Sequence, residues 1–317
     1  MDFILQKIKE YNRIIIHGHY RPDGDCIGSQ YGLYNIIKDS FPEKEVYITG
    51  EVSNYVAFVG EPTRVDEELF KGALSICVDC ATKDRLSDTR IDLADYVIKI
   101  DHHPAVDQYG DYNYVDDLSP ACAQIITEFY LKFQDELVLS KTAATALYVG
   151  ISTDTGRFKF DSVTSKTFNV AGVLVDKGVD LSYVDNHLSV ETLESLKLKG
   201  YVLTHFHMTE AGFAYIVMDR KTIAEYGVSD EDAAAQVSTI STIDGCPVWA
   251  IFVEYPEEIR IRLRSRGPVI NDLATKYEGG GHPKAAGGKL KNWEQLADFI
   301  KDADELVNNY KKNACNE

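Results

Sequence analysis

The sequence predicts an α/β protein in which a mostly parallel sheet flanked by helices is joined, through a helical linker, to a smaller α/β domain with a mixed sheet. Three observations support this fold class. In the first half, short β-rich runs alternate with amphipathic stretches, which is typical of βαβ units. The predicted strands are continuous apolar runs such as RIII, as expected of strands buried on both faces. Beyond about residue 204 the pattern changes to longer strands followed by helices.

The individual elements follow from this pattern. In the first domain, residues 1–187, strands are predicted at 13–18, 45–50, 73–80 and 96–101, and helices at 28–40, 120–133, 141–153 and 164–178. Residues 188–204 lack proline and contain glycine only at Gly200, so we expect a connecting helix there. In the second domain, residues 205–317, strands are predicted at 213–219, 248–255 and 258–265, and helices at 230–242, 269–277 and 292–312.

Composition and cysteine usage indicate a cytoplasmic globular protein. The 317 residues are 44% hydrophobic and 26% charged, with no signal-peptide pattern and no apolar run near the roughly 20 residues that span a bilayer. The six cysteines are scattered, as expected of free thiols. Cys77 and Cys80 form a CxxC, but on one strand their side chains would point to opposite faces, unless the strand has already ended at Cys80. Buried thiols are therefore favoured there over a zinc or redox site.

The formal net charge of -17 limits the ligands that the protein can bind. Long duplex nucleic acid is bound by a basic surface, so this class of partner is not expected, and neither is a membrane. A short anionic substrate held by a few local cations is compatible with the charge.

Acids and imidazoles gather where several predicted strands and one helix end. The members are His17 and His19, Asp23 and Asp25 in the PDGD turn, Asp79, Asp101 with His102 and His103, and Asp154. Taken singly, each has an ordinary structural explanation as a turn residue, a helix cap or a satisfied histidine. Carboxylates that converge at neighbouring strand ends would repel one another unless cations neutralise them, so the set as a whole favours a metal site.

The donor types also limit which metal fits. Mixed carboxylate and imidazole ligands suit Mn²⁺, and also Fe²⁺, Co²⁺ or Zn²⁺, whereas Mg²⁺ favours an all-oxygen shell. This many donors exceeds the needs of one ion and fits a pair of ions about 3.5–4 Å apart that share a carboxylate.

Several motifs in the chain resemble those of the DHH phosphoesterases. HYRPDGDCIGS, VDCA, DHHP and GISTDTGRF occur in that family's order, and DHH is Asp101-His102-His103. RSRG at 264–267 and GGGHPKAAGG at 279–288 resemble the DHH-associated substrate-binding domain. Within the superfamily, the paired histidines of HGHYRPDGD, the SQYGL segment and DTGRF are most similar to the bacterial nanoRNase/pAp phosphatase branch.

The resemblance implies a two-Mn²⁺ phosphoesterase with defined roles for its residues. Mg²⁺, Co²⁺ or Fe²⁺ would be substitutes, and the expected substrates are short RNA, linear dinucleotides and 3'-phosphoadenosine 5'-phosphate, which would be cleaved to nucleoside monophosphates. The implied metal ligands are His19, Asp23, Asp25, Asp79, His102 and Asp154. The hypothesis for their roles is that Asp79, alone or together with Asp154, would bridge the ions. His103 would protonate the leaving oxygen or bind a phosphate oxygen, and Asp101 would orient the two histidines. Cys26 occupies a variable place and receives no role, and His17 is undecided between orienting a ligand and packing.

Cations outside the cluster are expected to bind the substrate. Arg157 would neutralise the scissile phosphate, its alternative being a surface ion pair. In the second domain, glycine backbone can approach an anion closely, and Arg264 and Arg266 share a strand face. The predicted substrate clamp comprises Arg264, Ser265, Arg266, Gly279, Gly280, Gly281 and His282.

The sequence leaves alternatives open. A cyclic di-AMP phosphodiesterase would use the same metals, an exopolyphosphatase or pyrophosphatase would carry basic residues in place of the glycine-rich clamp, and a nucleotide sensor would bind without turnover. The physiological substrate, cleavage direction, native metal and oligomeric state, including a homodimer, are not determined by the sequence.

Overall fold

A computed structural model describes residues 1–314 as two compact units, Met1–Val190 and Glu191 onward. Cys315, one of the predicted free thiols, lies outside the described residues. Within residues 1–314, no helix has both the length and the apolar character needed to cross a membrane. The division between the units falls inside the predicted linker, and each unit has its own core.

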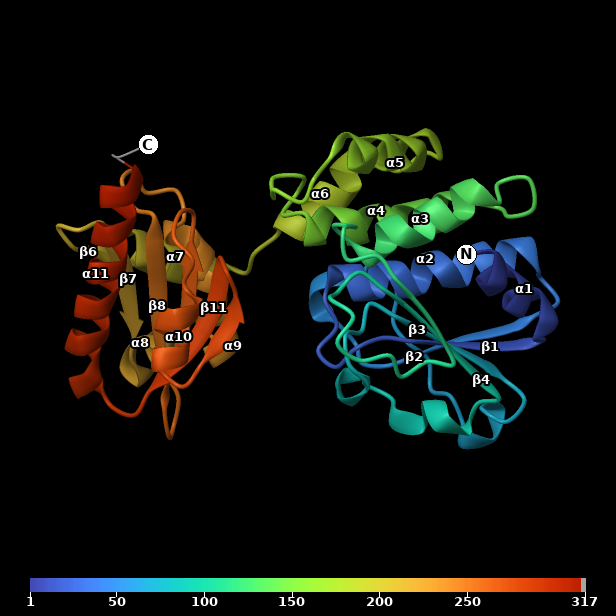
Figure 1. Cartoon of the computed structure of the whole chain (residues 1–317), viewed down its shortest axis with the longest axis horizontal. Helices are drawn as coiled ribbons and strands as arrows, with labels where there is room; N and C mark the ends of the chain where they lie inside the picture. The colour runs from blue at the N-terminus through green and yellow to red at the C-terminus, as the bar shows by residue number, and fades with distance from the viewer. Residues whose placement is uncertain (315–317) are drawn as a thin grey trace. The chain divides into compact units, whose positions relative to one another are not determined.

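Unit 1 is built on a five-stranded parallel sheet of order β2-β1-β3-β4-β5. Its strands are β1 (Arg13–His17), β2 (Glu45–Thr49), β3 (Leu74–Val78), β4 (Tyr96–Asp101) and β5 (Tyr112–Val115). Its helices are α1 (Asp2–Glu10), α2 (Gly24–Ser40), α3 (Cys122–Lys132), α4 (Lys141–Asp154), α5 (Ser165–Asp176) and α6 (Leu181–Ser189). Figure 1 shows α2, α3 and α4 layered over one side of this sheet.

Both faces of this sheet are buried, which explains its apolar runs. In β1, Ile14 and Ile16 join the core shared with the helices, while Ile15 faces a second cluster with Val65 and Phe70 from the irregular segment that follows β2. The predicted parallel α/β architecture is confirmed.

Unit 2 contains a six-stranded mixed sheet of order β10-β11-β9-β8-β7-β6. Its strands are β6 (His207–Met208), β7 (Phe213–Met218), β8 (Val248–Glu254), β9 (Ile259–Ser265), β10 (Gly280–His282) and β11 (Ala285–Leu290). Its helices are α7 (Leu193–His205), α8 (Arg220–Tyr226), α9 (Asp230–Ala235), α10 (Asn271–Lys276) and α11 (Leu296–Ala314). The cores on its two faces include residues of α10 and α11 on one side and of α7, α8 and α9 on the other.

One local prediction needs correction, and another is resolved. The predicted connecting helix over residues 188–204 starts later, as α7 at Leu193, and its first two residues belong to the end of α6. The reason is that Val190 is extended and the Thr192 hydroxyl starts α7 by accepting a hydrogen bond from the Ser195 amide. α7 then packs its buried Leu198 and Val202 into a core of unit 2. At the CxxC, β3 ends at Val78, before Cys80, and both cysteines are buried in one apolar cluster, as the prediction of buried thiols expects. Burial raises the pKa of Cys80 to about 11, as expected of a structural thiol.

Candidate functional site

The predicted metal ligands of unit 1 meet at the carboxyl edge of its sheet. β1, β3 and β4 are neighbours, so the segments that follow them lie side by side. The chain runs from β1 outward to β2 and then crosses back to β3, which places a topological switch point between β1 and β3. In open α/β sheets, this is where ligands bind.

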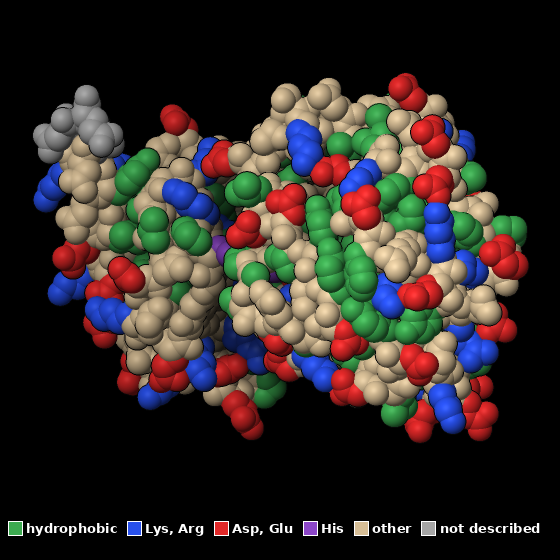
Figure 2. Space-filling view, turned by 45° about the vertical axis from the view of Figure 1, so that its right-hand side comes forward, with side chains coloured by type: hydrophobic (Ala, Val, Ile, Leu, Met, Phe, Trp, Pro, Cys, Tyr) green, Lys and Arg blue, Asp and Glu red, His purple; other side chains and the backbone are tan. Residues whose placement is uncertain are grey.

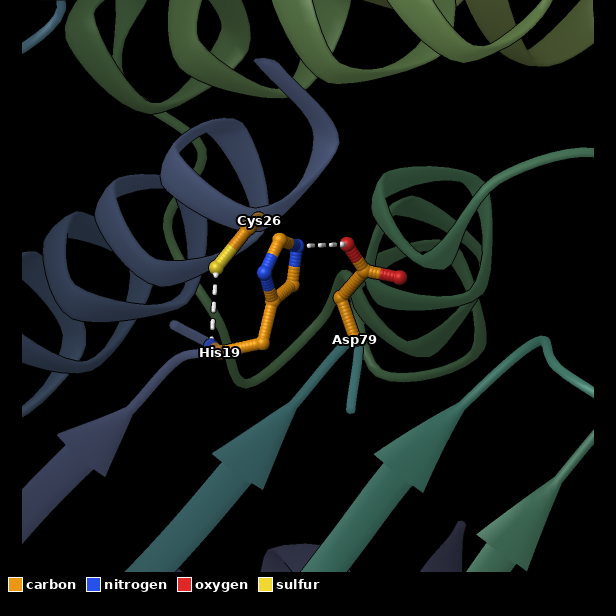
Figure 3. A group of neighbouring side chains, drawn as sticks. All are labelled: His19, Cys26 and Asp79. Carbon is orange, nitrogen blue, oxygen red and sulfur yellow. Dashed lines mark hydrogen bonds and ion pairs between the residues drawn. The ribbon is translucent and has the colours of Figure 1, made fainter. Parts of the chain in front are cut away.

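His19 is held in one orientation just beyond β1. Its Nδ1 lies 2.9 Å from the Tyr20 carbonyl oxygen, so this nitrogen carries the proton, and its backbone N–H donates to the Cys26 sulfur. The remaining nitrogen, Nε2, lies 3.6 Å from Asp79 Oδ2 and 3.7 Å from Asp23 Oδ1. Figure 3 shows the ring aimed at Asp79, with Cys26 on the side of the His19 backbone. A histidine fixed by one nitrogen in this way presents the other to a metal.

Helix α2 begins at Gly24, four residues earlier than the predicted start at Gly28. The cause is Asp23, whose carboxylate accepts hydrogen bonds from the Asp25 and Cys26 amides and so caps the helix. Gly28 is instead a contact point, since a Cβ there would lie 2.5 Å from the Ala146 carbonyl oxygen. This close approach of α2 to α4 brings Asp25 of one helix toward Asp154 of the other.

Asp25 is fixed by a helix from elsewhere in the chain. Its side chain is 1% exposed, and its two oxygens accept the Cys122 amide at 2.6 Å and the Ala123 amide at 2.9 Å. These amides start α3, whose own N-cap residue, Ala121, has no capping side chain. Asp25 therefore caps α3 across the fold while its Oδ2 stays 3.9 Å from His102 Nε2.

Asp79 connects two groups of donors. Oδ2 faces His19, and Oδ1 lies 3.3 Å from His102 Nε2. Oδ1 is buried and accepts no hydrogen bond among the described residues. Asp79 also has φ of 55°, a left-handed conformation that costs roughly 1–3 kcal/mol and that persists where surrounding structure demands it. Both features indicate a carboxylate positioned for a ligand.

His102 and Asp154 complete the second group. Nδ1 of His102 lies 3.2 Å from the Ser119 carbonyl oxygen, and its Nε2 is 3.3 Å from Asp154 Oδ2. Asp154 is the last residue of α4, not a loop residue after it. His19 and His102 thus share one arrangement, with Nδ1 at a carbonyl and Nε2 among carboxylates.

His103, Asp101 and Lys99 form a separate chain of contacts. Asp101 Oδ1 accepts His103 Nδ1–H at 2.8 Å and also the His102 amide at 2.9 Å. Its Oδ2 lies 3.2 Å from the ammonium of Lys99, and neither side chain has exposed surface. Lys99 donates further to the Ala81 and Asp107 carbonyl oxygens. Sequence reasoning missed Lys99, although a lysine inside the apolar run YVIKID was a signal.

The buried carboxylates repel one another, and this repulsion shifts the pKa values of the groups in the cluster. Burial, followed by nearby Asp79 and Asp154, raises the pKa of Asp25 well above its ordinary value. Burial also raises the pKa of Asp154 to about 6, against the opposing effect of His102. Burial lowers the pKa of His102, but the neighbouring Asp79 and Asp25 outweigh it and raise that pKa to about 10. Cations held between these groups would relieve this repulsion.

The donor set fits divalent cations. Among residues 1–314, three groups have ligand atoms within 4.8 Å of one another: His19, Cys26 and Asp79; Asp79, His102 and His103; and Asp25, His102 and Asp154. Asp79 belongs to two of them, and its unpartnered Oδ1 is the kind of buried atom that a cation satisfies. Cys26 is a structural member, since burial raises the pKa of its thiol to about 12 and its sulfur accepts the His19 amide.

Two residues from the first motifs have contacts of a different kind. His17 ends β1 with no exposed surface, and its Nε2 lies 3.0 Å from the Ser75 hydroxyl, a core contact. Burial lowers its pKa to about 4. The Arg157 guanidinium pairs with Asp185 at 2.6 Å and donates to Ser189 and to the Leu188 carbonyl oxygen. In this structure Arg157 thus makes an ion pair with α6, and its action on a phosphate stays a prediction.

Two of the three predicted clamp glycines, Gly280 and Gly281, are strand residues. GGH forms β10, which pairs with β11 through Gly280–Gly287, Gly281–Ala286 and His282–Ala285. A Cβ on Gly279 would lie 1.9 Å from the Gly287 carbonyl oxygen, so this position requires glycine for packing. Gly280 has nothing within 4 Å of the same point, which leaves its backbone open to a ligand.

The other predicted clamp residues gather along one row of this sheet. The pairing places His282 beside Ala285, Ala285 beside Arg264, and Arg264 beside Trp249. Arg266 follows the end of β9, and its guanidinium lies 5.7 Å from the Trp249 ring centroid. Trp249 was not predicted from the sequence. Ser265 is engaged in the following turn, where its hydroxyl donates to the Pro268 carbonyl oxygen and accepts the Gly267 amide.

A two-domain α/β chain with these acids and imidazoles at a sheet switch point has the features of a metal-dependent phosphoesterase, and the comparisons agree. The model of the DHH family, N-terminal domain, matches residues 13–151, and that of the DHHA1 domain matches residues 211–309. The chain belongs to the DHH family of phosphoesterases.

Relatives match it over nearly its full length. It is 37% identical over 304 residues to the bifunctional oligoribonuclease and PAP phosphatase NrnA of Bacillus subtilis, covering 96% of this chain and 97% of that protein. It is 39% identical to a probable protein of the same name from Streptococcus mutans, covering 96% and 98%. An exopolyphosphatase-related protein from Bacteroides fragilis has the same fold, with a TM-score of 0.86 at 23% identity over 96% of this chain and 95% of that one.

Proposed function

We propose that the protein hydrolyses very short oligoribonucleotides, including linear dinucleotides, and 3'-phosphoadenosine 5'-phosphate to nucleoside monophosphates. The observation that carries this proposal is Asp79, whose two oxygens face two different histidines, His19 and His102. The names of relatives that are 37–39% identical along the chain supply the substrate class.

The proposed metal content is two Mn²⁺ ions, for which Mg²⁺, Co²⁺ or Fe²⁺ could substitute. His19 and Asp23 would hold one ion, and Asp25, His102 and Asp154 the other, with Asp79 contributing to both. Mixed nitrogen and oxygen donors support Mn²⁺ over Mg²⁺. When bound, such ions supply Lewis acidity toward the phosphate ester and the attacking water.

The remaining residues would control proton transfer and orientation. Because His103 Nδ1–H is bound to Asp101, its Nε2 is the atom that exchanges a proton with the leaving oxygen. Lys99 holds the far oxygen of Asp101 and so keeps that carboxylate in place. His103 is one third exposed, whereas Asp101 and Lys99 are fully buried, which is the arrangement of a reactive group on a fixed support.

In unit 2, the proposed clamp uses Arg264, Arg266, His282 and the open backbone of Gly280. Burial, followed by the neighbouring Arg262, lowers the pKa of the Arg264 guanidinium, so an anionic ligand would be a favourable partner for it. Figure 2 shows acidic and basic side chains interspersed over the face in view. An anionic substrate would therefore depend on a few local cations and not on a broadly basic surface.

A cytoplasmic location belongs to the same proposal. The five cysteines among the described residues are all buried and unpaired, as is usual in a reducing compartment. A homodimer stays a prediction, to be tested by sedimentation velocity.

A substrate panel tests the function. Initial rates with Mn²⁺ and with Mg²⁺ would be measured on two- to five-residue RNA, pGpG, 3'-phosphoadenosine 5'-phosphate, cyclic di-AMP and polyphosphate. We expect the dinucleotides and 3'-phosphoadenosine 5'-phosphate to be cleaved fastest, with Mn²⁺ preferred. Faster cleavage of cyclic di-AMP or polyphosphate would replace the proposal with that activity, and binding without turnover would identify a sensor.

A further inference from the structure

Unit 1 contains a second concave feature, which we call the aromatic groove. Its volume is about 530 Å³, within the usual range of small-molecule sites. One wall comes from the 3₁₀ turn η1 (Asn54–Val56) and the residues after it, and the other comes from α6. The groove is lined by Asn54, Tyr55, Phe58, Asn186, His187 and Val190.

Two of the aromatic side chains that line the groove, Phe58 and His187, are held in fixed positions. The Phe58 ring centroid lies 4.6 Å from that of His187 and 5.9 Å from that of Tyr183, and the latter two are 4.1 Å apart. His187 Nδ1–H donates to the Tyr183 carbonyl oxygen at 2.8 Å, so its Nε2 remains an acceptor. Rings fixed in this way lose little conformational entropy when a ligand stacks on them.

The exposed surface of the groove combines apolar faces with amide groups. Tyr55 is 53% exposed and Val190 is 78% exposed, so the groove presents apolar area to solvent. Asn54 and Asn186 add side-chain amides, each with a donor and an acceptor. A nucleobase has the complementary form, with a π-face that stacks on aromatic rings and a polar edge that pairs with amides.

Both walls of the groove are anchored to helices that carry proposed metal ligands. Arg157, three residues after Asp154, binds Asp185, Ser189 and the Leu188 carbonyl oxygen, which flank His187 on α6. On the other wall, η1 lies against α2, the helix of Asp25, and also against α6. The position of the groove is therefore tied to the metal centre through the packing of unit 1.

We propose that the aromatic groove is a nucleobase subsite that stacks one base of the short oligonucleotide. This inference rests on the proposed function, which it deepens by assigning a base contact within unit 1. Arg157 is then a positioning residue that holds α6 in place. A second copy of this chain is a poorer occupant, because six lining residues are far fewer than the 20–30 on each side of a stable interface.

Kinetics on paired substrates test the subsite. Tyr55→Ala and His187→Ala would be compared with the wild type on pApA and on two analogues that lack either base. Stacking on an aromatic residue predicts a KM raised roughly 5- to 150-fold on pApA with kcat within about twofold. On the analogue that lacks the bound base, the wild type and both variants should have equal KM. Phe168→Ala, which removes a 57% exposed ring from α5, is the matched control and should leave KM unchanged.

Other results would overturn the inference. Equal increases in KM on all three substrates would indicate that the groove residues have a structural role. An unchanged KM on pApA would show that the groove does not bind the substrate. Weaker self-association of Tyr55→Ala with unchanged KM would make the groove an interface between copies. If the wild type does not cleave pApA, the proposed function is wrong. Binding of adenosine to the groove can then still test whether the groove is a nucleobase subsite. Shifts of the His187 ring signals in NMR on adding adenosine, lost in Tyr55→Ala, would support it, and their absence would refute it.

Discussion

The candidate sites of the two units are built in different ways. In unit 1, Asp25, Asp79 and Asp101 are at most 2% exposed. Asp25 is fixed by an amide from a distant segment, and Asp101 lies beside the buried ammonium of Lys99 on its own strand. In unit 2, Gly280 and His282 are exposed, and Arg266 is ordered mainly by the Trp249 ring. Donors that hold cations must be oriented before the cation arrives, whereas groups that bind a flexible nucleotide can remain accessible. Substitutions in unit 1 should therefore abolish hydrolysis, and those in unit 2 should weaken substrate binding.

Asp79→Asn is expected to have the largest effect. An amide replaces the carboxylate whose two oxygens face His19 and His102, so metal content should fall and hydrolysis should drop on the order of 10⁴-fold. Metal analysis by mass spectrometry and initial rates on pApA measure both. Asp135→Asn, at an exposed position, is the control and should match the wild type. Full Mn²⁺ content with normal rates in Asp79→Asn would contradict the two-metal assignment.

Lys99→Met tests the buried support of the same site. It leaves the Asp101 carboxylate without its ammonium partner, which should lower the free energy of unfolding by about 3–5 kcal/mol in urea titrations. The double variant Lys99→Met with Asp101→Asn removes the orphaned charge and should recover part of that loss. If the single and double variants were destabilised equally, the ion pair with Asp101 would not be the reason that Lys99 stabilises the fold.

The sequence predicted that the candidate metal ligands of unit 1 would lie together, but it did not predict the residues that surround and fix them. Strands that end in Asp or His could be recognised because parallel strands bring their carboxyl ends to one edge. The capping of α3 by Asp25 could not, since it joins residues 97 positions apart. The same limit applies to Arg157, whose partner Asp185 lies 28 residues away on α6. Local patterns report periodicity and turns, but they do not report which distant polar group satisfies a buried one.

In unit 2, the glycine run was assigned to an anion contact, and its packing role was not anticipated. This role depends on the tertiary structure, because the backbone of β11 occupies the space beside Gly279.

In unit 1, the start of α2 was predicted too late in the sequence. The reason is that Asp23 was treated as a turn residue and a metal ligand, not as a helix cap.

Gly279→Ala and Gly280→Ala form a matched pair for unit 2. The first would push a methyl group into the Gly287 carbonyl oxygen and should lower the free energy of unfolding of this unit by about 1–3 kcal/mol. The second meets open space and should leave stability within about 0.5 kcal/mol, while raising KM if substrate approaches this backbone. Urea titrations followed by the fluorescence of Trp249 and Trp293 measure the difference. Equal stability of the two variants would contradict the packing role of Gly279.

Arg266→Ala should have the smallest effect of the set. It removes the cation beside Trp249 and leaves all the candidate metal ligands of unit 1 in the sequence, so KM for pApA should rise about tenfold while Mn²⁺ content and kcat remain near wild type. Arg260→Ala removes an arginine of β9 that pairs with Glu258, and it is the control expected to change neither quantity. Loss of bound Mn²⁺ in Arg266→Ala would show that the two sites are not independent. An unchanged KM would show that Arg266 does not bind the substrate. The proposed clamp would then consist of Arg264, Gly280 and His282.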